Sequence, residues 1–305
     1  MKSYIVKSFI QVIPLLLLIT LIVFILVRVS GDPVSLMLPE DATEQDKVIL
    51  RAALGLDQPL YIQYVSFMSD VFQGDFGNSY RYNQPALSLV LERLPASIEL
   101  GVASLLVAIV ISFPLGIFSA LKRNTFWDLI ITGCSVLGKA TPNFWVGIML
   151  ILLISVQLGW LPVSGREGIS HLILPAITLG TGLTAQLTRL IRSNLLEVLE
   201  QDYVRTARSK GLNETLVICK HALRNSLLPV ITVLAMNLSG LVGGSLITEA
   251  IFAWPGMGQL VIQAVNTKDM AIVQAAVFVI SIIVIFSNLL ADIIYRYVDP
   301  RIKYN

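Results

Sequence analysis

Charged residues are scarce in this sequence of 305 residues, and so are histidine and cysteine. Only 14 % of the chain is charged, against roughly 25 % in an ordinary soluble domain, whereas 55 % is hydrophobic. A soluble globule of this length does not hide so much apolar surface. The composition therefore excludes a soluble enzyme and favours an integral membrane protein. The net charge of +2 is too small to indicate binding to nucleic acid.

The motifs of enzymatic and metal-binding sites are missing as well. The two cysteines, Cys134 and Cys219, and the two histidines, His171 and His221, lie far apart, without the spacing of a disulfide framework or a metal site. There is no Gly-x-x-x-x-Gly-Lys-Ser/Thr phosphate loop and no Gly-x-Ser-x-Gly motif. We therefore predict that the chain is not an enzyme, binds no metal and holds no cofactor.

Long apolar runs dominate the rest of the chain. A bilayer core about 30 Å thick needs about 20 apolar helical residues for each crossing. Six runs meet this requirement, at residues 9–27, 98–121, 129–158, 172–190, 227–247 and 270–294. Lys139 and Pro142 interrupt the third run. The sequence predicts an all-α integral membrane protein with six transmembrane helices.

The distribution of Lys and Arg predicts the orientation. With the amino terminus inside, the inner segments hold more Lys and Arg than the outer segments, so we expect both termini in the cytoplasm. The chain then reads as an amino-terminal transmembrane helix (1–29), an extracytoplasmic helical segment (30–95) and a five-helix core (96–305). That core contains a polar, basic cytoplasmic loop at 193–226.

The outer segment 30–95 carries two helix signals. Thr43 is placed to cap a helix ending near Gly55, and Asp57 to cap a second helix with Pro59 near its first turn. The second helix has one apolar face, formed by Tyr61, Tyr64, Val65, Met68 and Phe72. Two compatible interpretations follow: a packed lid over the membrane helices, or a docking surface for a molecule arriving from outside.

A few ionisable residues lie in or near the apolar runs. Glu99, Glu249 and Asp292 fall near predicted helix ends, where a charge costs less than at the membrane centre. Lys139 lies midway along the third run, so it either reaches the cytoplasmic interface or lines a water-filled path. The absence of paired intramembrane acids disfavours a proton-driven carrier.

The cytoplasmic loop resembles that of a known family. Residues 202–211 (DYVRTARSKG), followed by 221–225 (HALRN) and Leu228-Pro229, are similar to the loop of binding-protein-dependent ABC importer permeases. Ala207 and Gly211 match the general pattern of that superfamily. Arg205 and Thr206 replace the first two positions, as in the dipeptide, oligopeptide and nickel group.

The resemblance extends along nearly the whole chain. Matching segments lie at 31–33 (GDP), 55–60 (GLDQPL), 74–79 (GDFGNS), 249–258 (EAIFAWPGMG) and 299–301 (DPR). The long outer segment resembles the first of two paired permeases. The resemblance implies a type I importer permease fold in the bacterial inner membrane. The implied partners are membrane lipid, a second permease, two cytoplasmic ATPase subunits that bind the ATP, and an extracytoplasmic substrate-binding protein.

The resemblance also implies roles for particular residues. The coupling helix that contacts the ATPase is assigned to Asp202, Tyr203, Arg205, Thr206, Ala207, Arg208, Lys210 and Gly211. Small side chains at 206 and 207 permit close approach, and Gly211 permits a sharp turn. The basic residues there also fit topology alone, since positive charge is expected on the inside. A solvated hairpin without a partner is the alternative.

Two further sets complete the predicted sites. The translocation pathway is assigned to Lys139, Asn143, Gln186, Asn237 and Ser239, for which hydrogen bonding between helices is the alternative. Docking of the binding protein is assigned to Asp70, Phe76, Trp254, Pro255, Gly256 and Met257. The cargo stays open among a dipeptide, an oligopeptide, glutathione, nickel and a metal chelate. The alternative function is an ion-coupled secondary transporter without an ATPase.

Overall fold

The computed structural model describes residues 14–25, 34, 38, 43–53, 55–237, 240–243 and 245–298. These residues are mostly helical, and the only extended pairing among them is one isolated bridge between Asn78 and Pro85. The predicted all-α class is confirmed for this part of the chain. The chain divides into two compact units, Met1–Pro95 with Gly256–Ile285 (unit 1) and Ala96–Pro255 with Phe286–Asn305 (unit 2).

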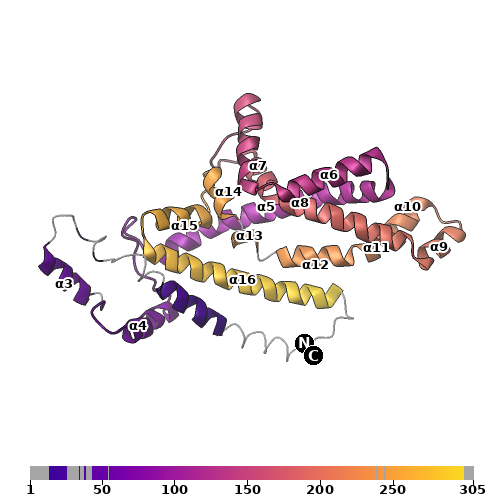
Figure 1. The fold of residues 1–305 in the computed structure, drawn as a ribbon. Coiled ribbons are helices and arrows are strands. Elements are labelled where there is room, and N and C mark those ends of the chain that lie inside the picture. The colour runs from indigo at the N-terminus through magenta and orange to yellow at the C-terminus, as the bar shows by residue number, and fades with distance from the viewer. Residues whose placement is uncertain are drawn as a thin grey trace. The chain divides into compact units, whose positions relative to one another are not determined.

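Unit 1 contains the helical stretch Pro14–Ile25, α3 (Glu44–Ala53), α4 (Leu60–Phe72) and α15 (Met257–Asn266) (Figure 1). It also holds the first turns of α5 (Ala86–Leu121) and much of α16 (Met270–Val298). Buried apolar side chains form its core, among them Phe24, Val71, Phe76, Val90 and Ile272. The rings of Phe76 and Phe278 lie 5.2 Å apart, so the loop after α4 is packed onto α16.

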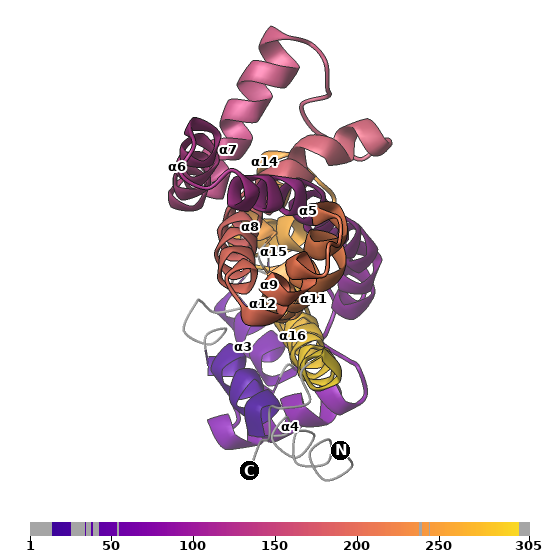
Figure 2. The ribbon, with the colours of Figure 1, turned by 90° about the vertical axis from the view of Figure 1, so that its right-hand side faces the viewer.

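Unit 2 is built around α8 (Ile169–Leu199). The other helices are α6 (Phe126–Ala140), α7 (Asn143–Leu150), the π-helical η1 (Ile151–Gln157), α9 (Asp202–Ser209), α10 (Glu214–Leu216), the π-helical η2 (Val217–Ala222), α11 (Leu223–Ser226), α12 (Leu228–Asn237), α13 (Gly240–Gly243) and α14 (Leu246–Ile251). Figure 2 shows α6 beside α8, which also contacts α7, α11 and α12. Unit 2 therefore has a single central helix.

The α5–α8 seam forms the core of unit 2. Three buried clusters follow one another along it, centred on Leu100 with Ala176, on Ala108 with Leu187, and on Ala120 with Leu195. Two glycines allow the close approach. A Cβ at Gly180 would lie 2.8 Å from the Ser104 carbonyl oxygen, and one at Gly116 would lie 2.8 Å from the Ile191 Cβ. Small residues at such seams let helix backbones pack tightly in a membrane.

Among the residues that the structure describes, two helices are both long and apolar enough to cross a membrane as single rods. They are α5 and residues Met270–Ile294 of α16. Two bent pairs qualify when each is taken as one span: Phe126–Ala140 with Asn143–Gln157, bent by 107°, and Glu214–Ser226 with Leu228–Asn237, bent by 48°. The fourth predicted run lies inside α8, whose Thr, Gly and Gln residues dilute its apolar character. The structure therefore shows several apolar helices in the described part of the chain.

The interruption of the third run is confirmed. The helix α6 ends at Ala140, and Pro142 is the N-cap of α7. Proline has no N–H to donate and disfavours a helical conformation at the residue before it, so one helix ends and another begins. Within the predicted fifth run, 227–247, the structure describes α12 (Leu228–Asn237), α13 (Gly240–Gly243) and the start of α14.

The helix signals of the outer segment are confirmed in one case and wrong in the other. Thr43 and Asp46 form a reciprocal cap at the start of α3, with the Asp46 N–H donating to the Thr43 Oγ1 and the Thr43 N–H to the Asp46 carboxylate. Asp57 does not cap α4. The N-cap is Pro59, whose carbonyl accepts the first helical hydrogen bonds, from Ile62 and Gln63.

Candidate functional site

The predicted coupling helix exists as α9, the first arm of a helical hairpin. Val204 and Ala207 are buried one turn apart and pack with Val217 of η2, while Val198 and Leu199 at the end of α8 cover the same cluster. This small core fixes how α9 lies against α8 and η2. Because Val204 and Ala207 point inward, the opposite face of α9 is left at the surface.

The exposed stripe of α9 is polar. Its exposed residues recur three or four positions apart: Asp202, Arg205, Thr206 and Ser209. Lys210 follows at the helix end and is exposed as well. Ser209 belongs to this face although the family motif gave no reason to select it. The burial of Ala207 explains its small size by packing within this chain. Its predicted contact with an ATPase stays a prediction.

Gly211 ends the helix with a φ of +75°, a left-handed conformation that favours glycine. A Cβ built on it meets nothing within 4 Å in this chain. The expected turn is confirmed. Glycine is favoured at this turn because of the positive φ. A side chain at position 211 would not clash with any described residue of this chain.

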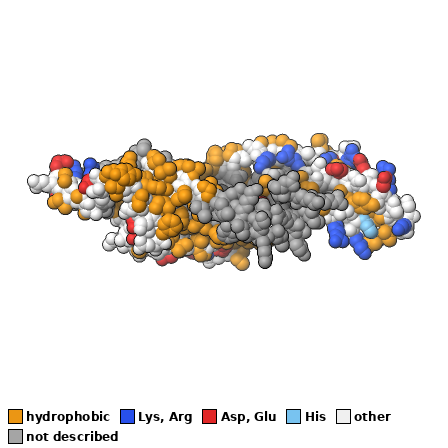
Figure 3. All heavy atoms as spheres, turned by 90° about the horizontal axis from the view of Figure 1, so that it is seen from below, with side chains coloured by type: hydrophobic (Ala, Val, Ile, Leu, Met, Phe, Trp, Pro, Cys, Tyr) orange, Lys and Arg blue, Asp and Glu red, His pale blue; other side chains and the backbone are white. Residues whose placement is uncertain are grey.

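Polar bonds close the hairpin. The Arg208 guanidinium donates to both carboxylate oxygens of Glu214, with a closest distance of 2.7 Å, and holds the pKa of that carboxyl below its ordinary value of 4.5. The Asn225 side chain donates to the Tyr203 hydroxyl at 2.9 Å, which ties α9 to α11. Arg208 and Tyr203 therefore serve the hairpin itself. Figure 3 shows the Lys and Arg side chains gathered at this end of unit 2.

Three of the predicted pathway residues lie along the contact of α6 and α7 with α8. The Lys139 ammonium donates to the Gln186 amide oxygen at 3.2 Å, and the Asn143 amide oxygen lies 3.7 Å from the position of a Cβ on Gly182. Asn237 instead bonds back to the Val233 carbonyl of its own helix. Ser239 lies outside the described residues. The structure thus brings Lys139, Asn143 and Gln186 to one seam.

A partly buried ion pair anchors the same seam and was not predicted. Arg192 of α8 makes two bonds to the Asp128 carboxylate, at 2.6 and 2.8 Å, and Asp128 also accepts from the Ser119 hydroxyl and the Asn124 N–H. Asp128 is only 4 % exposed. Fork-like pairing of this kind fixes geometry as well as charge. An Asp at the first turn of an apolar helix, with Arg far away in the chain, gives no sequence signal for the pairing.

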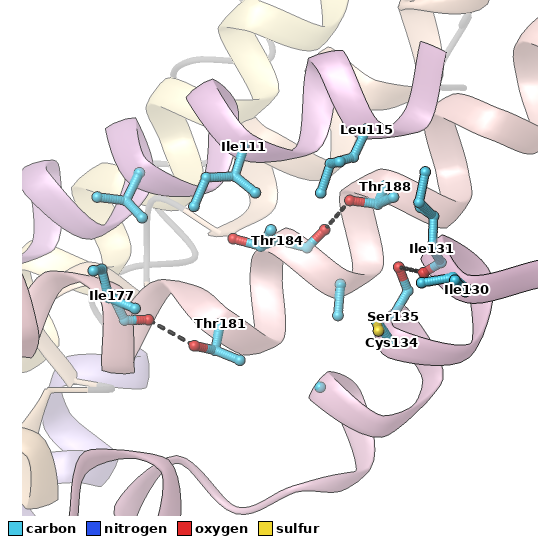
Figure 4. Close-up of a pocket in the computed structure, with 13 residues that line it drawn as sticks. Ile111, Leu115, Ile130, Ile131, Cys134, Ser135, Ile177, Thr181, Thr184 and Thr188 are labelled. Atoms are coloured by element: carbon cyan, nitrogen blue, oxygen red, sulfur yellow. Dashed lines mark hydrogen bonds between the residues drawn. The ribbon is translucent and has the colours of Figure 1, made fainter. Parts of the chain in front are cut away.

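A pocket of about 340 Å³ lies between α5, α6 and α8 (Figure 4). Its lining includes the aliphatic side chains of Ile111, Leu115 and Ile177 and three threonines of α8. Their hydroxyls donate to carbonyls four residues earlier in the same helix, as at Thr181 and Ile177, which leaves little polar capacity for a ligand. We therefore regard it as apolar packing space rather than a recognition site for a polar solute.

The predicted docking loop is held inside unit 2 by a cluster of polar contacts. Trp254 is fully buried, its indole N–H donates to the Ala96 carbonyl at 2.8 Å, and the Arg166 guanidinium lies 5.6 Å from its ring centre. Arg166 in turn donates to Glu99. The buried Glu249 accepts hydrogen bonds from the Ser97 and Ser245 hydroxyls, each at 2.7 Å.

The docking residues differ in exposure. Four of the six are buried: Phe76, Trp254, Gly256 and Met257. Pro255 is half-buried, and Asp70 is exposed on α4. Beside Trp254, Ala253 is exposed and has a φ of +46°, so the loop presents its backbone at that point. Their docking role stays a prediction. Asp70 and Ala253 are exposed, so they are suitable positions for crosslinking to a binding protein.

Comparison with known proteins places these features in a family. Residues 112–304 match the model described as binding-protein-dependent transport system inner membrane component, and residues 1–101 match the model of its amino-terminal part. The chain is 41 % identical over 316 residues to the oligopeptide transport system permease protein AppB of Bacillus subtilis (strain 168). It is 37 % identical over 305 residues to the glutathione transport system permease protein GsiC of Escherichia coli (strain K12).

Both alignments cover 100 % of each chain, as does a third, at 36 % identity, with the dipeptide transport system permease protein DppB of Alkalihalophilus pseudofirmus. Among solved structures, the chain resembles a chain of the inward-facing MetNI methionine ABC transporter. The TM-score is 0.57 at 19 % identity, over 69 % of this chain and 96 % of that one. This structural likeness concerns the fold alone.

Proposed function

The chain belongs to the family of inner-membrane components of binding-protein-dependent transport systems, and from this premise we propose that it forms half of the pathway of an ATP-driven peptide importer. A second, homologous permease supplies the other half. Two cytoplasmic ATPase subunits bind the ATP, and an extracytoplasmic binding protein delivers the cargo. The observation that carries the proposal is full-length similarity to three permeases of peptide and glutathione systems.

In this proposal the chain crosses the membrane six times, with both termini in the cytoplasm. Two crossings are α5 and α16, a third is the bent pair Phe126–Ala140 with Asn143–Gln157, and a fourth is the run 227–247, which contains α12. The other two are the 31-residue α8 and the run 9–27, which includes the helical stretch Pro14–Ile25. The proposal keeps the predicted division of the chain into an amino-terminal transmembrane helix (1–29), an extracytoplasmic segment (30–95) and a five-helix core (96–305). Since α5 begins at Ala86, the outer segment 30–95 ends inside this helix.

We assign coupling to the exposed stripe of α9. A side chain that contacts an ATPase surface has to reach it, so Asp202, Arg205, Thr206, Ser209 and Lys210 are the contact residues in this proposal. Tyr203, Ala207, Arg208 and Gly211 contribute by shaping the hairpin that carries them. The polar, charged character of the stripe suits a contact that forms in water and is renewed in each cycle.

The pathway is assigned to the seam with Lys139, Asn143 and Gln186, together with Asn237 and Ser239. The Lys139–Gln186 bond leaves donors of the ammonium group available to a passing carboxylate or carbonyl. Peptides, including glutathione, offer both groups. Peptides are therefore the proposed cargo class, and a metal chelate is the alternative.

Reconstitution of the assembled importer tests this function against an ion-coupled carrier. Proteoliposomes would hold the chain with its co-purifying ATPase and permease subunits, with ATP on the ATPase side and the membrane potential collapsed. We expect uptake of labelled dipeptide, pentapeptide or glutathione that requires the binding protein and stops when ATP is omitted. Uptake driven by an ion gradient alone, without nucleotide, would refute the proposal.

A further inference from the structure

The helix α4 carries two apolar stripes, and only one of them is covered by unit 1. The covered stripe contains Tyr64, Phe67 and Val71, and it packs on the helical stretch Pro14–Ile25. The second stripe contains Tyr61, Val65, Met68 and Phe72, spaced at four, three and four residues, so that they share one face. Tyr61, Val65 and Phe72 of this stripe are 71 %, 66 % and 83 % exposed.

The third face of α4 is mostly polar, although Ile62 is 41 % exposed there. Ser66, Ser69 and Asp70 are exposed there, and Asp70 is the only charged residue among the 13 residues of the helix. In a helix whose uncovered sides all face water, three large exposed apolar side chains are unfavourable. In a helix lying at a membrane surface the same arrangement is favourable, because the apolar stripe faces lipid and the polar stripe faces water.

Contacts with Pro14–Ile25 set the depth of α4. The Tyr64 hydroxyl lies 3.2 Å from the Leu17 carbonyl oxygen and 3.1 Å from the Thr20 hydroxyl, and the Phe24 ring lies 5.4 Å from the Tyr64 ring. Leu17 lies next to the middle residue of the predicted span 9–27, and Thr20 and Phe24 lie between that middle and the outer end. A helix packed against them shares their depth, at the level of the outer leaflet.

The exposed apolar surface continues from one helix to the other. Leu15, Leu18 and Ile22 of Pro14–Ile25 are 44 %, 53 % and 47 % exposed, as expected for side chains that face lipid. Figure 3 shows hydrophobic side chains gathered over α4 and this stretch. The uncovered stripe of α4 is thus continuous with a surface that the proposed span already assigns to lipid.

We propose that α4 is a lipid-contacting helix, set in the outer leaflet beside the first span, with Tyr61, Val65 and Phe72 against acyl chains and Ser66, Ser69 and Asp70 toward water. This inference rests on the proposed function through the span 9–27. The inference places α4 at the membrane surface, whereas the sequence was compatible with a lid over the membrane helices or a docking surface. With no Lys or Arg in α4, the contact relies on apolar burial and is independent of anionic lipid.

Fluorescence quenching in the reconstituted importer tests this position. Cys134 and Cys219 are first replaced by serine, and single cysteines are then introduced at Val65, Phe72, Ser69 and Leu18 and labelled with an NBD fluorophore. Leu18 is the lipid reference, and Ser69 is the matched control on the polar stripe of the same helix. The vesicles contain phosphatidylcholine with a nitroxide at acyl carbon 5 or 12, and iodide is the aqueous quencher.

We expect nitroxide at carbon 5 to quench the labels at 65 and 72 at least threefold more than the label at 69, with the opposite order for iodide. Replacing a third of the lipid by phosphatidylglycerol leaves the result unchanged. Iodide quenching at 65 and 72 equal to that at 69 would show an aqueous lid and overturn the inference. Protection from both quenchers would show a covering protein and overturn it as well.

The reference position separates this inference from the span on which it rests. If the label at Leu18 is quenched by lipid nitroxide and those at 65 and 72 are not, only the position of α4 is wrong. If the label at Leu18 is not quenched either, the first span of the proposed function fails, and the inference fails with it.

Discussion

The hairpin that contains α9 and the outer segment that contains α4 expose opposite kinds of surface. Each is a short helix pinned by a few contacts, Val204 and Ala207 on η2 and α8 in one case, Tyr64 and Phe67 on Pro14–Ile25 in the other. The uncovered face of α9 is polar and charged, and an uncovered stripe of α4 is aromatic and aliphatic. Under the two proposals, this difference in exposed composition matches the surroundings: water and a protein partner for α9, and lipid for α4.

The largest expected effect comes from a charge in the small core of the hairpin. Val204→Asp places a carboxylate without a partner at a fully buried site, which costs on the order of 3 kcal/mol and unfolds the hairpin. Limited proteolysis should then cleave within residues 193–226. Arg205→Asp, one position along on the exposed stripe, is the control and should stay resistant. Equal resistance of the two variants would mean that α9 is not held by this core.

A bulky residue on the exposed stripe tests what α9 faces. Thr206→Trp should leave the hairpin protease-resistant and lower peptide uptake at least tenfold, because the new side chain blocks the proposed ATPase contact. Thr215→Trp, exposed on the second arm, is the matched control and should transport normally. Normal uptake by Thr206→Trp with intact ATPase recruitment would contradict the coupling assignment.

A milder change probes the packing of α4. Tyr64→Phe keeps the ring contact with Phe24 and removes the hydroxyl that bonds at Thr20 and Leu17, a loss of about 1 kcal/mol. Hydrogen exchange in residues 60–72 should become about fivefold faster. Tyr61→Phe, on the uncovered stripe, should leave exchange unchanged. No difference between the two would show that the hydroxyl of Tyr64 does not hold α4 in place.

The smallest effect concerns the ion pair of the hairpin. The pKa of Glu214 is lowered by Arg208, so the pair stabilises the hairpin above pH 4.5 and its contribution is lost as the pH falls through the lower folded value. Both side chains are partly exposed, which limits the contribution to about 0.5 kcal/mol.

Glu214→Gln should therefore weaken protease resistance of the hairpin slightly at pH 7, and its difference from the unmodified protein should shrink as the pH is lowered below 4.5. Thr215→Ser serves as the control and should show no such pH-dependent difference. A Glu214→Gln deficit that does not shrink as the pH falls below 4.5 would point to a cause other than the charge of the pair.

Much of the architecture is determined by local sequence. The scarcity of charge and the long apolar runs give a helical membrane protein, Pro142 breaks the third run, and Gly211 ends α9. The order of short motifs was sufficient to indicate the permease family. These features depend on a few neighbouring residues, so a single sequence predicts them.

Only the tertiary structure decided which faces are covered. Helical spacing groups Val204 with Ala207, and Tyr61 with Phe72, and it does not say which group meets a neighbour. The burial of Trp254 and the pairing of Asp128 with Arg192 likewise join residues far apart in the chain. Such contacts arise when helices pack, because burial is a property of the neighbouring surface as much as of the residue itself.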